Sequence, residues 1–268
     1  MPNNLKSVAL VDDICGYGKC SINVMLPTIS AAGIEVCCGV TSVYTTHTPI
    51  KGYKKLETNP ILDDTIVSWR NLSLSFDAIY TGALSNKDQA YQCMQLFADQ
   101  PKAIKICDPV LGDFGNFYDK NFESLLPHMK KLCSHADIIT PNITEAQLLC
   151  TLKSENPEEL LHSLAKTGAK NIILKGHVEG ENISNYLLDK NGEITKFSAS
   201  YYDFVIHGAG DFFSACIISH LIKNGNLKKS IDFATNITSD AVKFTISQAG
   251  FENKGISFET FLKKLTNL

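Results

Sequence analysis

The stretch His207-Gly208-Ala209-Gly210-Asp211-Phe212-Phe213-Ser214-Ala215-Cys216-Ile217-Ile218-Ser219 joins a glycine-rich turn to an apolar, helix-compatible run. Such a turn delivers the chain to a helix N-terminus, where the first amide groups lack partners and the helix dipole adds positive charge. Glycines remove the Cβ atoms that would keep an anion away. We therefore expect Gly208, Ala209 and Gly210 to bind a phosphate or a developing phosphoryl charge.

Asp211 lies in the same turn, and two roles are open to it. A carboxylate beside a bound phosphate is repulsive unless it takes a proton from a reacting group, which would make Asp211 a general base. Aspartate is also a good helix cap, so a purely structural role fits these residues equally well.

Composition narrows the classes of partner. The chain has 268 residues, of which 44% are hydrophobic and 20% charged, with a net charge of -3. That charge gives no electrostatic case for nucleic acid or an anionic membrane. Arg70 is the only arginine, so anions must be bound by backbone amides, lysines and metal ions. A short polar N-terminus and the lack of a membrane-length apolar run lead us to expect a cytoplasmic protein.

The nine cysteines are scattered, and no Cys-x-x-Cys pair occurs. Zinc binding and dithiol redox chemistry are therefore weak interpretations. Most of the thiols are expected to be small buried side chains in a reducing compartment.

Short apolar runs alternate with helix-length segments, which predicts a mostly parallel sheet covered by helices in one domain, residues 1–268. Asp189-Lys190-Asn191-Gly192 predicts a later hairpin, and Thr41–Leu56 predicts a small flap over a site. The expected strands are Ser7–Val11, Glu35–Val40, Ala78–Thr81, Ala103–Cys107, Ile138–Thr140, Asn171–Lys175, Ile183–Leu188 and Glu193–Phe197. The expected helices are Ser21–Ala32, Leu62–Asn71, Lys87–Ala98, Phe122–Cys133, Pro157–Lys166, Gly210–Lys223 and Leu227–Ser247.

Polar side chains gather just after the expected strands, where ligands of doubly wound sheets bind. Oxygen donors there suit Mg²⁺, which binds between carboxylates and nucleotide phosphates. The candidate metal ligands are Asp108, Asp113 and Glu145, and the candidate ATP-binding residues are Asp108, Asn142, Glu145 and Lys175. Asp12, Asp13, His47 and Thr48 are candidates for contact with the substrate, although either aspartate could instead close the turn after the first strand and we expect at most one of the two to contact the ligand.

Structural alternatives exist for these residues. Asp108 before Pro109 fits an ordinary turn, and Asn142 with Glu145 fits a capping box that opens a helix. Gly16-Tyr17-Gly18 lacks both the ending of a P-loop and the third glycine of a dinucleotide fingerprint, so those two nucleotide-binding classes are disfavoured.

Taken together, the motifs resemble the ribokinase-like superfamily and, within it, the vitamin B6 kinases. The motifs that carry the resemblance are Gly208-Ala209-Gly210-Asp211, Cys107-Asp108-Pro109-Val110-Leu111-Gly112-Asp113, Thr140-Pro141-Asn142 with Glu145, and Ser42-Val43 followed by His47-Thr48. The resemblance implies a three-layer α/β sandwich with a mostly parallel sheet. It also implies ATP-dependent phosphorylation of the 5'-hydroxymethyl group of pyridoxal, pyridoxine or pyridoxamine, with Mg²⁺ as cofactor, K⁺ as a further candidate ion, and a homodimer.

This sequence departs from the family pattern at two positions. Pyridoxal kinases tend to carry serine where this chain has Asp12, and tyrosine where it has Ala83. Hydroxymethylpyrimidine kinases share the superfamily motifs and are the first alternative. A kinase for another small hydroxyl compound and a catalytically silent sensor of a vitamer or nucleotide are the others.

Overall fold

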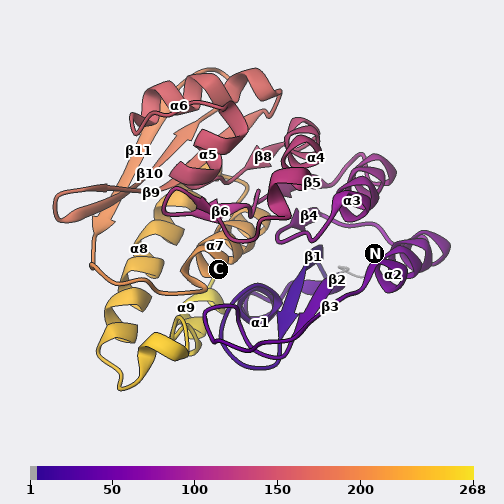
Figure 1. Ribbon diagram of the computed structural model, residues 1–268, viewed down its shortest axis with the longest axis horizontal. Coiled ribbons are helices and arrows are strands. Elements are labelled where there is room, and N and C mark those ends of the chain that lie inside the picture. The colour runs from indigo at the N-terminus through magenta and orange to yellow at the C-terminus, as the bar shows by residue number, and fades with distance from the viewer. Residues whose placement is uncertain (1–4) are drawn as a thin grey trace.

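A single sheet organises the described part of the chain, residues 5–268 of this computed structural model (Figure 1). The strand order is β11-β10-β9-β8-β5-β4-β1-β2-β3, with parallel pairing from β9 to β2 and antiparallel strands at both margins. The strands are β1 Ser7–Cys15, β2 Glu35–Tyr44, β3 Lys55–Glu57, β4 Ala78–Thr81, β5 Ile104–Cys107, β8 Ile138–Ile139, β9 Asn171–Glu179, β10 Asn182–Leu188 and β11 Ile194–Ser200; β6 Gly112–Asp113 and β7 Asn116–Phe117 form a separate ribbon.

The central strands are apolar on both faces because helices cover both. Along β1, Val8 and Leu10 enter one buried cluster while Ala9 and Val11 enter the other. This alternation follows from the two-residue period of a strand, which sends successive side chains to opposite faces of the sheet. A continuous apolar run therefore builds two cores at once.

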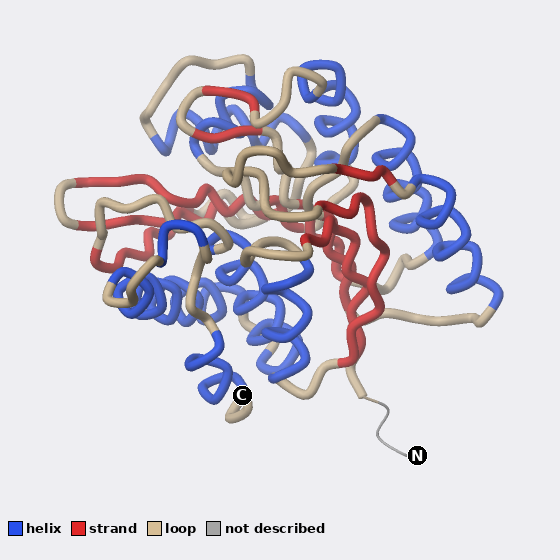
Figure 2. The backbone as a smooth tube through the Cα atoms, turned by 60° about the horizontal axis from the view of Figure 1, so that its bottom comes forward, coloured by secondary structure: helices blue, strands red, loops and turns tan. Residues whose placement is uncertain are grey.

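The helices divide between these two cores, and Figure 2 shows them on both sides of the strands. One core receives α2, α3, α4, α5 and α6, and the other receives α1, α7, α8 and α9. Among the described residues, no helix is both long and apolar enough to cross a bilayer. Their bounds are α1 Ile22–Ala31, α2 Asn59–Asn71, α3 Lys87–Asp99, α4 Phe122–Ser134, α5 Ile143–Cys150, α6 Pro157–Leu164, α7 Ala209–Asn224, α8 Leu227–Ile246 and α9 Leu262–Leu265.

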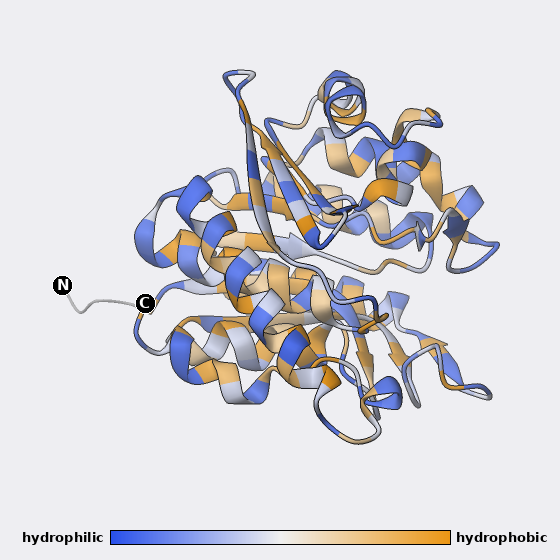
Figure 3. Cartoon of the chain, turned by 90° about the vertical axis from the view of Figure 1, so that its left-hand side faces the viewer, coloured by the Kyte–Doolittle hydropathy of each residue, from blue (hydrophilic) through white to orange (hydrophobic). Residues whose placement is uncertain are grey.

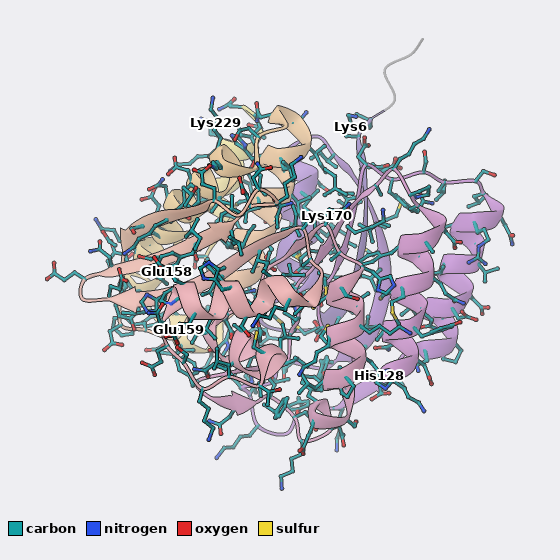
Figure 4. All side chains as sticks on the ribbon, turned by 90° about the horizontal axis from the view of Figure 1, so that it is seen from above. Lys6, His128, Glu158, Glu159, Lys170 and Lys229 are labelled. Carbon is teal, nitrogen blue, oxygen red and sulfur yellow. The ribbon has the colours of Figure 1, made fainter. Side chains whose placement is uncertain are left out.

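Helix α6 illustrates how the outer layer is built. Asn156 caps it by accepting hydrogen bonds from the amides of Glu158 and Glu159, and Pro157 occupies the first turn. Glu158 and Glu159 lie on the outer face (Figure 4), while Leu160 and Leu161 are buried. Figure 3 shows hydrophilic and hydrophobic residues alternating along helices of the surface, as expected for helices with one polar and one apolar face.

Four strands extend beyond their predicted C-terminal ends, and three of these extensions, in β1, β2 and β9, bear on the site. The sequence predicts a first strand ending at Val11, whereas β1 continues through Asp12 and Asp13 to Cys15, with a register shift against β2 between Asp12 and Ile14. Asp12 and Asp13 interrupt the apolar pattern, so hydrophobicity alone does not show that the strand continues. The backbone of β1 nevertheless stays paired with β2, with a bulge-like irregularity at this point.

The predicted flap is also shorter than Thr41–Leu56. Strand β2 includes residues 41–44 and β3 pairs with it antiparallel, so the connecting loop spans residues 45–54. Strand β9 passes Lys175 and continues to Glu179, where it pairs antiparallel with β10 in a hairpin that the sequence pattern does not predict; the predicted hairpin joins β10 to β11. The turn at Asp189–Gly192 forms as expected, with Gly192 at a φ of 84°.

Candidate active site

The carboxyl ends of β5, β8 and β9 meet at one edge of the sheet. Asp108 directly follows β5, Asn142 lies three residues beyond β8, and Asn142 and Lys175 pair as an isolated parallel bridge. The structure thus gathers residues from distant parts of the sequence because parallel strands place their ends side by side.

Asp108 and Lys175 form the closest charged pair at this edge. The Lys175 ammonium lies 2.6 Å from Asp108 Oδ2, and Asp108 is only 2% exposed. Burial disfavours the lysine charge, but Asp108 and Glu145 together raise the pKa of Lys175 above its ordinary value. The Tyr80 hydroxyl donates to the same Asp108 oxygen over 3.1 Å, and Ser214 Oγ lies 3.5 Å from it.

The second oxygen of Asp108, Oδ1, is buried and has no hydrogen-bond partner. Buried carboxylate oxygens are normally satisfied, so an unpaired one indicates a ligand position. An oxygen of this kind suits Mg²⁺, which takes one or two protein carboxylates and completes its shell with phosphate oxygens and water. The residues at this edge therefore fit a magnesium–nucleotide complex.

Lys175 also reaches the glycine-rich turn. A Cβ at Gly210 would lie 3.7 Å from the Lys175 ammonium, so the lysine charge lies beside the first turn of α7. Since the N-cap residue Gly208 has no side chain, it provides no capping hydrogen bond to the first amides of α7. Amides, helix dipole and lysine charge together make this turn electropositive.

Position 208 requires glycine for two reasons, its backbone conformation and the lack of room for a side chain. Its φ is 81°, in the left-handed region that favours glycine, and a Cβ there would collide with the Lys19 carbonyl oxygen. The turn is thus packed against the loop that connects β1 to α1. Ile256 completes this support by donating its amide to the His207 carbonyl over 2.9 Å.

Asp211 lies in the first turn of α7, as the sequence predicts. Its Oδ2 accepts the backbone amide of Ser21 over 2.8 Å, and Ser21 precedes α1 in a left-handed conformation with a φ of 50°. Burial raises the pKa of Asp211 to about 6, and the negative charge of Asp108 adds to that rise. A carboxyl that titrates near neutral pH can exchange a proton with a bound hydroxyl group.

Asn142 and Glu145 form the capping box of α5. Each side chain accepts the other residue's backbone amide over 2.8 Å, and Glu145 also accepts the Leu111 amide over 3.3 Å. Burial raises the pKa of Glu145 to about 8. Asn142 and Glu145 therefore do form the capping box that is the structural alternative for them. The same arrangement places the ionisable side chain of Glu145 next to Lys175.

Asp113 lies apart from the buried cluster. It belongs to the β6–β7 ribbon, is only half-buried, and accepts the amide of the next residue, Phe114. Within residues 5–268, His, Cys, Asp and Glu side chains form no group of three or more that could hold a metal ion by themselves. A metal at this edge would thus depend on oxygens from its substrate as well as from Asp108.

Asp12 and Asp13 form a second acidic group on β1. Asp12 Oδ1 accepts the amides of Ala83 and Asp13, while Asp12 Oδ2 and Asp13 Oδ1 are buried without a partner. Burial raises the pKa of Asp12 well above its ordinary value, and the charges of Asp13 and Asp211 contribute to that rise. The three acids are therefore close enough to influence one another.

His47 and Thr48 differ sharply in environment. His47 is 2% exposed, its Nε2 lies 3.1 Å from the Asn253 carbonyl, and its ring lies edge-on to His207. Thr48 is exposed. His47 thus connects the loop of residues 45–54 to the C-terminal segment.

Sequence reasoning missed several contributors to the site. Tyr80 and Ser214 contact Asp108, while Lys19 and Ser21 contact the glycine-rich turn. Ser214 could have been found, because it follows Asp211 by three positions on one helix and so faces the same side. The contributions of Lys19 and Ser21 are backbone groups, which leave no signal in side-chain chemistry.

Comparison with known proteins identifies the family to which this chain belongs. The profile of the phosphomethylpyrimidine kinase family matches residues 22–255. A pyridoxal kinase of Actinobacillus pleuropneumoniae is 25% identical over 202 residues, which is 69% of this chain and 69% of that protein. A hydroxymethylpyrimidine/phosphomethylpyrimidine kinase of Haemophilus influenzae is 25% identical over 256 residues, which is 91% of this chain and 94% of that one.

A solved structure supports the same family assignment. A protein of Bacteroides thetaiotaomicron assigned to the phosphomethylpyrimidine kinases, in a crystal form with pyridoxal, is 29% identical to this chain. It matches with a TM-score of 0.92 over 98% of this chain and 96% of that one. The expected ribokinase-like fold and phosphotransfer to an alcohol group are thereby confirmed, and the chain belongs to the phosphomethylpyrimidine kinase family.

Proposed function

We propose that this protein uses ATP to phosphorylate the 5'-hydroxymethyl group of a vitamin B6 vitamer: pyridoxal, pyridoxine or pyridoxamine. The observation that carries the proposal is the meeting of Asp211, the Gly208–Gly210 turn and Lys175 at one edge of the sheet. This arrangement offers a base, an anion-binding turn and a phosphate-binding charge within one site, which are the groups that phosphoryl transfer needs.

In this mechanism Asp211 accepts the hydroxyl proton while the substrate oxygen forms its bond to the γ-phosphorus. The bond from that phosphorus to the β–γ bridging oxygen breaks, and ADP leaves with the electron pair. The amides of Gly210 and Asp211 hold the negative charge that develops on the transferred group. Lys175 supports the nucleotide phosphates, and the Ser21 amide keeps the Asp211 carboxylate oriented.

Mg²⁺ would be held by Asp108, whose Oδ1 is available, with Glu145 nearby. When bound, it neutralises charge on the β- and γ-phosphate oxygens. Such a cation would offset the charge of Asp12, Asp13, Asp108 and Asp211, which share this edge with Lys175 and, beside Asp13, with Lys55.

For the vitamer ring we propose contacts with Asp12, Asp13, His47 and Thr48. The buried, unpaired oxygens of Asp12 and Asp13 support this role most directly. The buried His47 ring supports a part in shaping the flap, and Thr48 lies on the exposed side of that loop.

Hydroxymethylpyrimidine is the alternative substrate. The family match and the Haemophilus relative, which aligns along nearly the whole chain, favour it. The similarity to pyridoxal kinases and to a structure with pyridoxal favours the vitamer. Both compounds are flat heteroaromatic rings with a hydroxymethyl group, so the same mechanism serves either.

Magnesium-dependent ADP release, measured in parallel with the three vitamers, hydroxymethylpyrimidine and several sugars, tests the proposal. We expect turnover on a B6 vitamer at least ten times that on the other compounds. Turnover confined to the pyrimidine alcohol or a sugar would replace the substrate while keeping the mechanism. Silence on every compound, with ATP still bound, would favour a sensor.

We also infer a homodimer. Val43, Tyr53, Leu56 and Ile61 are exposed apolar side chains on or near the marginal strand β3. An uncovered strand at the margin of a sheet is a natural pairing surface. Light scattering that gives a monomer mass at micromolar concentration would contradict this inference.

A further inference from the structure

Two cysteines that are separated in sequence meet beside the candidate active site. The sulfur atoms of Cys15 and Cys20 lie 3.6 Å apart, although four residues separate them and the chain has no Cys-x-x-Cys motif. Both are free thiols, with Cys15 buried and Cys20 half-buried. The loop of residues 16–19 therefore folds back on itself and closes a dithiol that the spacing alone does not reveal.

This loop is fixed at its start by Asn23. The Asn23 side chain accepts the Cys15 amide over 3.0 Å and donates to the Cys15 carbonyl over 2.8 Å. Cys15 is thus held as part of β1, whereas Cys20 belongs to the connection into α1. Any change in the distance between the two sulfur atoms must be taken up mainly by Cys20 and its neighbours.

The neighbours of Cys20 on either side contact the catalytic turn. The Lys19 carbonyl packs against Gly208, and the Ser21 amide donates to Asp211 Oδ2 over 2.8 Å. Gly208 has no room for even a Cβ beside that carbonyl. A displacement of Cys20 would therefore be transmitted to both the anion-binding turn and the carboxylate of Asp211.

The two thiols also influence each other's pKa. The hydrogen bond with Cys20 lowers the pKa of the Cys15 thiol, although burial opposes this effect. The same hydrogen bond, together with burial, raises the pKa of Cys20 above its ordinary value. The hydrogen bond between the two sulfur atoms can run in either direction, so either thiol can react first and the other then resolves the oxidised partner.

We propose that Cys15 and Cys20 are a site of reversible oxidation, and that their disulfide interrupts phosphoryl transfer by withdrawing Ser21 and Lys19 from the catalytic turn. The oxidant is a small hydroperoxide. One of the two thiols, as its thiolate, attacks the O–O bond and becomes a sulfenic acid, while the leaving oxygen takes a proton to give water or an alcohol. The sulfur of the other cysteine then attacks the sulfenic sulfur, the S–S bond forms, and the proton of the second thiol leaves with the hydroxyl as water.

A second pair of thiols provides an internal control. Cys107 and Cys133 have sulfur atoms 3.8 Å apart, nearly the same separation, but both are fully buried in the core. The hydrogen bond with Cys107, together with burial, raises the pKa of Cys133 well above its ordinary value and keeps this thiol protonated. If proximity alone governed oxidation, both pairs would form a disulfide; if access and position govern it, only Cys15–Cys20 would.

The first arm of the test reads the disulfide by mass and needs no activity. The full-length protein is treated with hydrogen peroxide, free thiols are blocked, and the chain is digested with trypsin. Cleavage after Lys19 separates Cys15 from Cys20, so the two peptides stay joined only if a disulfide links them. The second peptide also contains Cys37 and Cys38, so the Cys20→Ser variant must abolish the link.

The second arm measures turnover and rests on the proposed function. We expect at least a tenfold loss on oxidation, full recovery with a dithiol reductant, and no loss in Cys20→Ser, whose reduced activity should match that of the wild type. Cys133→Ala should lose turnover on oxidation as the wild type does. A missing link, a link confined to Cys107–Cys133, or an undiminished turnover in the linked protein would each overturn the proposal.

The two arms separate the possible failures. If the proposed substrate is wrong, the peptide link still forms while the vitamer assay is silent before and after oxidation. Turnover of the reduced and the oxidised protein is then compared with whichever alcohol substrate the ADP-release assay identifies. If oxidation inactivates Cys20→Ser as strongly as the wild type, another thiol is responsible and the assignment to this pair fails.

Discussion

The two edges of the parallel sheet carry the same residue types and use them differently. At the amino edge, Asp77 and Asp137 directly precede β4 and β8. Asp77 accepts the Ser7 amide over 2.9 Å and the Lys6 ammonium over 2.7 Å. Asp137 accepts the Lys105 amide over 2.9 Å and the Lys170 ammonium over 2.7 Å. These aspartates tie the starts of neighbouring strands together.

At the carboxyl edge, several aspartates each keep one buried carboxylate oxygen without a hydrogen-bond partner. Within residues 5–268, the buried carboxylate oxygens that lack a hydrogen-bond partner belong to Asp12, Asp13 and Asp108, all at this edge. Hydrogen bonds from Lys105 and Lys170 outweigh burial and lower the pKa of Asp137, whereas burial raises that of Asp211. An acid whose oxygens are all hydrogen-bonded stabilises the fold, whereas a buried acid with an unpaired oxygen indicates a position where a ligand binds.

The strongest test of this contrast removes the lysine at the carboxyl edge. Lys175→Met would leave Asp108 buried without its ionic partner, which costs about 3–5 kcal/mol of the free energy of unfolding. Turnover should fall as well, because the nucleotide phosphates lose their lysine. Urea unfolding followed by circular dichroism measures the first effect. A loss below about 1 kcal/mol would mean that the ion pair of Lys175 with Asp108 does not stabilise the fold.

The next effect is on the reaction itself. Asp211→Asn should keep the fold and lower kcat by roughly 100-fold or more, because a positioned base contributes that much to proton transfer. Asp137→Asn, the matched change at the amino edge, should lower the melting temperature and leave kcat within about twofold of the wild type. Near-normal turnover in Asp211→Asn would reduce the role of Asp211 to its structural hydrogen bond with the Ser21 amide.

The pH dependence gives a third, smaller effect. A folded-state pKa of about 8 for Glu145 means that the native protein binds a proton more tightly than the unfolded chain does. Its contribution to stability is therefore complete below pH 4 and is lost as pH rises to 8. Unfolding measured from pH 5 to 8 should show stability falling more steeply in the wild type than in Glu145→Gln. Equal slopes would contradict the raised pKa.

The same principle predicts the rate profile. With a pKa of about 6, Asp211 is protonated and inactive as a base at pH 5. The value of kcat/KM should therefore rise about tenfold from pH 5 to 7 and then level off. A profile that is flat across this range would argue against Asp211 as the titrating base.

The smallest effect lies at the amino edge. Lys170 is solvent-exposed, so its ion pair with Asp137 is screened by water and salt. Lys170→Met should leave both kcat and the melting temperature within experimental error of the wild type. A clear loss of turnover would show that the two edges are coupled, and the contrast between them would need revision.

The sequence predicts the sheet well because its central strands are buried on both faces, which leaves unmistakable apolar runs such as Val8–Val11. It predicts the chemistry at strand ends for the same reason, since parallel strands align their ends. Asp108, Lys175 and the turn at Gly208–Asp211 are brought together as expected, while their roles in catalysis stay predictions.

The remaining parts were hidden for physical reasons. Asp12 and Asp13 interrupt the apolar pattern, so the continuation of β1 could not be read from hydrophobic periodicity. The partners of Gly208 and Asp211 are the carbonyl of Lys19 and the amide of Ser21, and backbone groups are the same in every residue. The Cys15–Cys20 contact depends on how a loop closes, which spacing alone does not determine.

The hydrogen bond from Ser21 to Asp211 joins positions 190 residues apart, and the glycine-rich turn is further supported by Ile256. During synthesis the N-terminal part of the chain leaves the ribosome long before the C-terminal part exists. The hydrogen bond that orients the base therefore cannot form until synthesis has passed Asp211, and the turn gains the support of Ile256 later still. A chain that stops just before Asp211 contains every strand of the main sheet and yet lacks the base, so the sheet and the catalytic turn are completed at different stages of synthesis.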